Sequence, residues 1–128
     1  MQAEQTTGEI INAAYEVHNA LGVGFLEKVY ENALARELQL RGFSVEQQVA
    51  LTVFYKAERV GEYFADMVVN GEIILEIKAV DKIIAIHEVQ LVNYLVATHK
   101  EIGFVINFGK SVTVKRKYKN PVHPVNPV

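Results

Sequence analysis

The sequence predicts a mixed α/β fold, in which helices cover a sheet of parallel and antiparallel strands. Residues 73–80 form an almost continuous apolar run, which is typical of a strand covered on both faces. The dipeptide Asn70-Gly71 directly before this run is a strong hairpin signal. A helical pattern over residues 87–99 then separates the run from later strands, and a helical crossover between strands indicates a mixed sheet.

Two helices are expected before the first strand. Thr6 and Glu9 have the spacing of a capping box, and the apolar stripe that follows predicts a helix near residues 7–21. Glu27 begins a second helical pattern, for which Gly42 provides the end.

The remaining elements are mostly strands. Strand-like runs occupy residues 44–55, 60–69 and 72–80. The helix over residues 87–99 follows, with Leu91, Val92, Leu95 and Val96 expected on its buried side. Two further strands are predicted over residues 103–108 and 111–118.

Length and composition indicate one globular domain over residues 1–120, followed by a proline-rich tail over residues 121–128. Half of the residues are hydrophobic, which excludes a disordered chain. Cysteine is absent, so disulfides and cysteine-ligated zinc are excluded. No apolar stretch approaches the roughly 20 residues that span a bilayer, and we expect a soluble, cytoplasmic protein without a membrane partner.

The net charge of −2 argues against a generic polyanion binder, although basic residues are concentrated near the end of the chain. Residues 110–119 include five basic residues and no acidic one. An edge strand protected by lysines explains this pattern as well as a phosphate-contacting surface does. The candidates for contact with nucleic acid are Lys115, Arg116 and Lys117.

Three charged residues interrupt the apolar strand pattern. Glu76 and Lys78 are two residues apart and therefore point to the same side of one strand, where burial requires compensation or serves a function. Asp66 lies on the preceding strand and can converge with them. A two-residue hairpin loop would place Asp66 and Glu76 on opposite faces, so we expect an odd-length loop or a bulge, with Gly71 at positive φ. A plain intrastrand ion pair between Glu76 and Lys78 is the alternative.

Asp66, followed on the next strand by Glu76-Ile77-Lys78, resembles the core motif of the PD-(D/E)xK nuclease superfamily. Ala65 stands in place of the usual proline. Two further motifs strengthen the resemblance, which covers about residues 8–118. Gln90 and Tyr94 are similar to the QxxxY motif of RecB-like nucleases, and Gly24, Glu27 and Tyr30 match the GxxExxY signature of a small prokaryotic family within that superfamily.

The resemblance implies a restriction-endonuclease-like αβββαβ core with an extra N-terminal helix. It also implies a Mg²⁺- or Mn²⁺-dependent nuclease, with DNA as the expected partner. Asp66, Glu76 and the Ile77 carbonyl would bind the metal, and Lys78 would lie beside the attacking water and the phosphate. Glu27, Gln90 and Tyr94 would complete the site.

Several alternatives stay open at this point. A nuclease-fold module could bind nucleic acid or a protein partner without cutting, and an assembly protein could use Glu76 and Lys78 as an ion pair only. A homodimer is also compatible with the sequence. Gln47 or Gln48 on the first strand could face the site, and the sequence does not choose between them.

Overall fold

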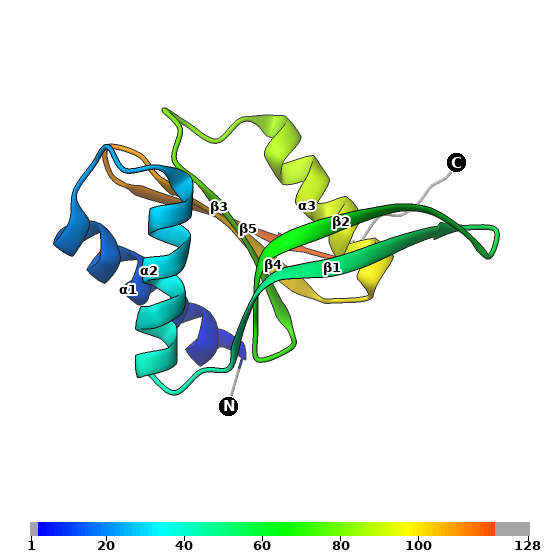
Figure 1. Cartoon of the computed structure of the whole chain (residues 1–128), viewed down its shortest axis with the longest axis horizontal. Helices are drawn as coiled ribbons and strands as arrows, with labels where there is room; N and C mark the ends of the chain where they lie inside the picture. Colours follow the sequence, from blue (N-terminus) through cyan, green and yellow to red (C-terminus); the bar gives the residue numbers. More distant parts are fainter. Residues whose placement is uncertain (1–2, 120–128) are drawn as a thin grey trace.

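The computed structural model describes residues 3–119, and within this range the elements follow the predicted order (Figure 1). The mixed α/β class is confirmed. The proline-rich tail predicted at residues 121–128 lies outside the described residues. The elements are α1 (Ala3–Leu21), α2 (Glu27–Leu40), β1 (Val45–Tyr55), β2 (Glu58–Val69), β3 (Ile73–Lys78), α3 (Ala85–Thr98), β4 (Ile102–Phe108) and β5 (Val112–Tyr118).

The strands form one mixed sheet with the order β1-β2-β3-β4-β5. β3 and β4 are parallel, and the other neighbouring pairs are antiparallel. Parallel neighbours require a crossover connection, which α3 provides. β1 and β5 are therefore the edges of the sheet.

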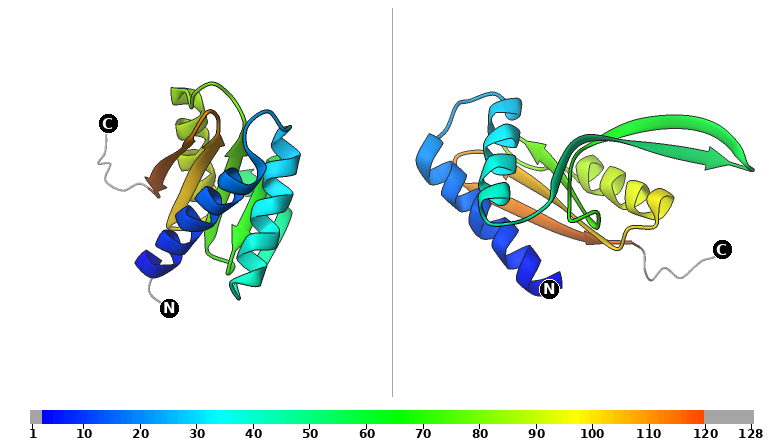
Figure 2. Two further views of the ribbon diagram at one scale, coloured as in Figure 1. Left: turned by 90° about the vertical axis from the view of Figure 1, so that its left-hand side faces the viewer. Right: turned by 60° about the horizontal axis from the view of Figure 1, so that its bottom comes forward.

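The helices lie in two layers, with α1 and α2 on one side of the sheet and α3 on the other (Figures 1 and 2). β3 contributes to both cores. Its residues Ile73, Leu75 and Ile77 pack in the cluster that contains α1 and α2, whereas Ile74 packs with Leu91 of α3. This alternation is the reason that the run is apolar at nearly every position.

The turn between β2 and β3 has the predicted odd length. Val69 pairs with Ile73, so the loop consists of the three residues Asn70, Gly71 and Glu72. Asn70 and Gly71 have φ angles of 54° and 68°, which confirms the expected positive φ of Gly71. The paired register ends at Met67 and Leu75, just before Asp66 and Glu76 are reached.

The helices differ from expectation in two details. α1 begins at Ala3, and the predicted capping box at Thr6 is wrong, because Thr6 and Thr7 are buried inside the helix. The Thr7 hydroxyl instead donates a hydrogen bond to the Glu4 carbonyl at 2.9 Å. Val96 of α3, expected to be buried, is exposed. No helix in residues 3–119 is long and apolar enough to cross a membrane.

Candidate active site

Asp66 and Glu76 form the centre of the candidate site, at the point where β2 and β3 stop pairing. The last pair of this ladder is Met67 with Leu75. One residue further, the Ile77 backbone N–H donates a hydrogen bond to Asp66 Oδ2 at 2.7 Å. Burial raises the pKa of Asp66, while this hydrogen bond acts in the opposite direction. Strand separation thus leaves Asp66 close to the backbone of Ile77.

Glu76 is the most strongly perturbed carboxyl group of the site. Burial, followed by the negative charge of Asp66, raises its pKa to about 8. Glu76 Oε2 is buried and accepts no hydrogen bond in the structure. A buried carboxylate oxygen without a partner carries a desolvation cost that a cation could offset.

Lys78 lies two residues beyond Glu76 on the same face of β3 and is half-buried. Burial raises the pKa values of Glu27, Asp66 and Glu76, and the positive charge of Lys78 partly opposes this rise. Within residues 3–119, however, no carboxylate lies within 4.0 Å of its ammonium group. The plain ion pair between Glu76 and Lys78 is therefore not formed, and the ammonium group keeps its hydrogen-bond donors.

The loop before α2 delivers Glu27 to the same site. Gly24 has a φ of 101°, which favours glycine, and the buried Tyr30 hydroxyl donates to the Gly22 carbonyl at 2.6 Å. These two residues of the GxxExxY pattern thus shape the loop. Burial raises the pKa of Glu27, the first residue of α2. The positive charge of Lys78 opposes this rise, and the negative charge of Asp66 adds to it.

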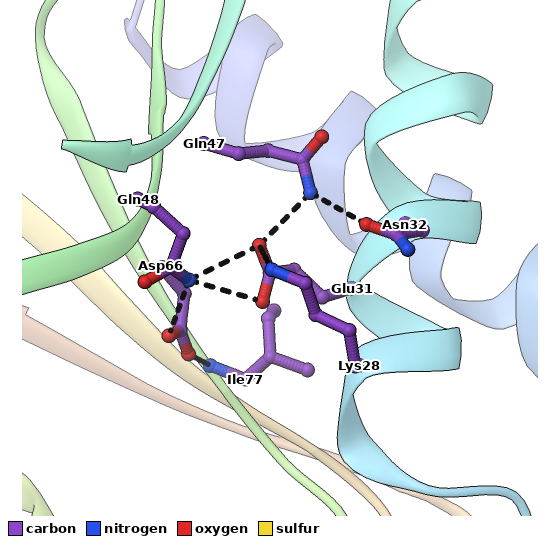
Figure 3. A network of polar contacts seen from close by, with 7 residues as sticks. All are labelled: Lys28, Glu31, Asn32, Gln47, Gln48, Asp66 and Ile77. Carbon is purple, nitrogen blue, oxygen red and sulfur yellow. Dashed lines mark hydrogen bonds and ion pairs between the residues drawn. The ribbon is translucent and has the colours of Figure 1, made fainter.

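Glu31 is a site residue that the sequence reasoning missed. It lies one helical turn after Glu27, and it is 4% exposed. Its carboxylate accepts hydrogen bonds from three side chains (Figure 3). Its negative charge also contributes to the raised pKa values of Asp66 and Glu76. The three donors are Lys28 at 3.2 Å, Gln47 at 2.9 Å and Gln48 at 3.3 Å. The four-residue spacing of Glu27 and Glu31, which places both on one face of a helix, was the sequence signal that could have identified Glu31.

Both glutamines of β1 reach this network. Gln47 bridges Glu31 to Asn32 of α2. Gln48 joins Glu31 to Asp66, the latter at 3.4 Å, and has a positive φ of 52° (Figure 3). This local break in the β1 ladder turns the Gln48 amide toward the carboxylates. The sequence did not decide whether Gln47 or Gln48 faces the site. Both side chains contact Glu31, and Gln48 also contacts Asp66.

Tyr94 lies near the site, in a stack with a second residue that the sequence reasoning did not identify. The rings of Tyr94 and Tyr63 are 3.3 Å apart between centroids and inclined by 20°. Burial and then the charge of Glu76 raise the pKa values of both hydroxyl groups. Tyr63 Oη is buried without a hydrogen-bond partner. Gln90, one turn before Tyr94, is exposed, and its side chain forms no hydrogen bond with residues 3–119.

The three basic residues predicted to bind nucleic acid do not share one face. Strand alternation along β5 separates Arg116 from Lys115 and Lys117. Arg116 is exposed, and its guanidinium lies 5.4 Å from the centre of the Phe104 ring, which belongs to the core cluster formed with α1 and α2. On the other face, Lys117 forms an ion pair with Glu88 of α3 at 2.8 Å. Because β5 is an edge strand, protection of the edge explains these residues without a ligand.

The donor atoms of the site fit a hard divalent cation. Residues 3–119 contain no group of three or more Asp, Glu or His side chains gathered around one metal position. Mg²⁺ commonly binds through one or two carboxylates together with water and phosphate oxygens. Asp66 and the unpartnered Glu76 Oε2 could supply the two carboxylates, with the Ile77 carbonyl as a further oxygen.

Comparisons with known proteins agree with this geometry. No curated relative matches the chain. The crystal structure of SSO0001 superposes with a TM-score of 0.58 at 18% identity, over 74% of this chain and 50% of that one. This chain thus spans half the length of SSO0001, and the similarity shows the fold alone. A family model described as PD-(D/E)XK nuclease superfamily matches residues 4–120, and the mixed five-stranded sheet is consistent with a restriction-endonuclease-like fold. The chain belongs to the PD-(D/E)XK nuclease superfamily.

Proposed function

We propose that this protein is a Mg²⁺- or Mn²⁺-dependent nuclease that hydrolyses phosphodiester bonds in DNA. The observation that carries the proposal is the buried, unpartnered Glu76 Oε2, which faces the charge of Asp66 without an ion pair to Lys78. Such an arrangement is costly in the metal-free protein and suits a site that binds a cation. Within the superfamily, the loop built on Gly24 and Tyr30 supports membership of the RecB-like GxxExxY group.

A divalent ion supplies Lewis acidity and lowers the pKa of a bound water, which makes hydroxide available near neutral pH. Asp66, Glu76 and the Ile77 carbonyl would hold this ion. The Lys78 ammonium group would donate hydrogen bonds to the attacking water and to a phosphoryl oxygen, where negative charge develops. Glu27 would accept a hydrogen bond from that water and restrict its orientation. Glu31, held by the two glutamines, positions Gln48 against Asp66.

The direct test is cleavage of labelled single- and double-stranded DNA and RNA with Mg²⁺, Mn²⁺ or a chelator. Glu76→Gln and Lys78→Met should each lower the cleavage rate by about 10²-fold or more, and the chelator should abolish cleavage. Glu72→Gln is the matched control, because Glu72 is an exposed carboxylate in the adjoining hairpin loop. Binding of nucleic acid without cleavage under every metal condition would instead identify a non-catalytic module.

Asp66→Asn tests the metal-binding role of Asp66 through stability as well as activity. The asparagine oxygen can still accept the Ile77 hydrogen bond, while one buried negative charge next to Glu76 disappears. We expect the metal-free variant to melt at the same temperature as the wild type or higher, to show no stabilisation by millimolar Mn²⁺, and to cleave no DNA. Thermal melts with and without Mn²⁺ check this. Equal stabilisation of both proteins by the metal would remove Asp66 from the ligand set.

A further inference from the structure

The outer part of the β1–β2 hairpin is an isolated two-stranded ribbon. β3 pairs with β2 from Met67 to Val69, and before that point β1 is the sole strand partner of β2 among residues 3–119. We call residues 50–64 the distal ribbon. Figure 1 and the right-hand view of Figure 2 show this ribbon extending well beyond the rest of the sheet.

One face of the distal ribbon is anchored and the other is free. On the anchored face, Leu51 packs in the cluster formed with α3, and its partner Tyr63 stacks on Tyr94 of that helix. The adjacent positions point the opposite way. There, Phe64 is 52% exposed. Phe54, which lies just beyond a register shift in the pairing of β1 and β2, is 64% exposed. The ribbon therefore presents Phe54 and Phe64 to solvent, and Tyr55 at its outer end is 61% exposed as well.

The charge of the distal ribbon does not suit phosphate binding. Lys56 and Arg59 are balanced by Glu58 and Glu62, and Arg59 already forms an ion pair with Glu62 at 3.1 Å. Surfaces that track the nucleic-acid backbone carry an excess of basic residues. Exposed aromatic rings suit stacking on base faces, which are accessible only when the bases are unpaired. Affinity of this ribbon for nucleic acid would therefore come from stacking, because the basic excess that such surfaces usually add is absent here.

The free face also leads toward the candidate active site. Phe64 precedes Asp66 by two residues, which corresponds to about 7 Å along an extended strand. Phe64 pairs with Ala50, and Phe54 lies four residues further along β1, so the two rings are separated by about 13 Å along the ribbon. A strand whose scissile phosphate lies at Asp66 could thus pass over Phe64 and then Phe54.

We propose that Phe54 and Phe64 form a stacking platform for unpaired bases of the substrate, so that the preferred substrate contains a single-stranded segment beside the cleaved bond. This inference rests on the proposed nuclease function and specifies its substrate. The occupant is a nucleic-acid strand, and a second copy of the protein on this face is the competing outcome.

The test measures binding of a fluorescent 12-nucleotide oligothymidylate and of a 12-base-pair duplex, with the Asp66→Asn chain as the non-cleaving background. Adding Phe64→Ala or Phe54→Ala should weaken binding of the oligothymidylate by about 5- to 150-fold and leave duplex binding unchanged. Phe64→Trp should retain the binding. Tyr15→Ala is the matched control, because Tyr15 is an exposed aromatic residue on α1. Melting temperatures verify that every variant is folded.

The outcomes separate this inference from the proposed function. Unchanged oligothymidylate affinity in both alanine variants overturns the platform, even if the wild-type protein cleaves DNA. Loss of that affinity supports the platform, even if the wild-type protein cleaves nothing. A wild-type dimer in sedimentation that the alanine variants dissociate would assign the face to a second copy and also overturn the platform.

Discussion

The two faces of β3 show how one short strand serves the core and the candidate site at once. Ile73, Leu75 and Ile77 are fully buried against the layer of α1 and α2. On the opposite face, Ile74, Glu76 and Lys78 alternate with these apolar residues. Burial of the first face stabilises the fold through the hydrophobic effect. The second face instead holds a buried carboxylate oxygen, Glu76 Oε2, without a hydrogen-bond partner, which carries a desolvation cost. Adjacent residues should therefore respond to substitution with opposite signs.

The largest expected effect is on the apolar face. Leu75→Ala removes a fully buried side chain and leaves a cavity in the larger core, so the free energy of unfolding should fall by about 2 to 5 kcal/mol. Chemical denaturation of the metal-free protein measures this. A loss below about 1 kcal/mol would mean that the two faces of β3 do not differ in the way described.

On the polar face, stability should depend on pH through Glu76. Its folded-state pKa of about 8 lies above the ordinary value of 4.5, so the folded protein binds more protons than the unfolded chain between these values. Stability should therefore fall as pH rises from about 5 to 8, by at most about 1.4 kcal/mol per pH unit. Glu76→Gln should flatten this dependence and be the more stable protein at pH 8. Denaturation curves at pH 5, 6.5 and 8 check both expectations, and parallel curves for the two proteins would contradict them.

The same contrast explains what the sequence could predict. Local patterns were sufficient for the order of the elements. The odd hairpin loop followed instead from the requirement that Asp66 and Glu76 share a face, because the Asn70-Gly71 dipeptide by itself favours a two-residue loop. The capping box at Thr6 was wrong because burial against the core decides that position, which no local spacing reports. Tertiary context thus overrides the weaker helix-end signals.

The site could be predicted only where its residues share a strand or a motif. Glu31 and Tyr63 were missed because their roles arise when α2 meets β1 and when α3 meets β2, which are contacts between distant segments. Alternation along β5, by contrast, was available from the sequence and already places Arg116 on the face opposite to Lys115 and Lys117. Clusters of charge in sequence are therefore not clusters of charge in space.

A smaller effect separates two buried tyrosine hydroxyl groups. Tyr30 Oη donates to the Gly22 carbonyl at 2.6 Å, whereas Tyr63 Oη has no hydrogen-bond partner. Tyr30→Phe should lower the free energy of unfolding by about 1 kcal/mol, and Tyr63→Phe should leave it unchanged or raise it by up to about 1 kcal/mol. Chemical denaturation of the two matched variants measures the difference. Equal losses would show that the Tyr63 hydroxyl has a partner in solution.

The smallest effect is expected at Gln90, which shares a motif with Tyr94 but not its environment. Gln90 is exposed, whereas Tyr94 stacks on Tyr63 and responds to the charge of Glu76. Gln90→Ala should change the free energy of unfolding by less than about 0.5 kcal/mol. We expect its DNA cleavage rate to stay within about twofold of the wild type, because a side chain without a contact at the site can affect the reaction only through the substrate. A loss of cleavage rate of tenfold or more at unchanged stability would show that Gln90 contacts the bound substrate strand. Cleavage by Tyr94→Phe under the same conditions would then show which residue of the pair contributes more to the rate.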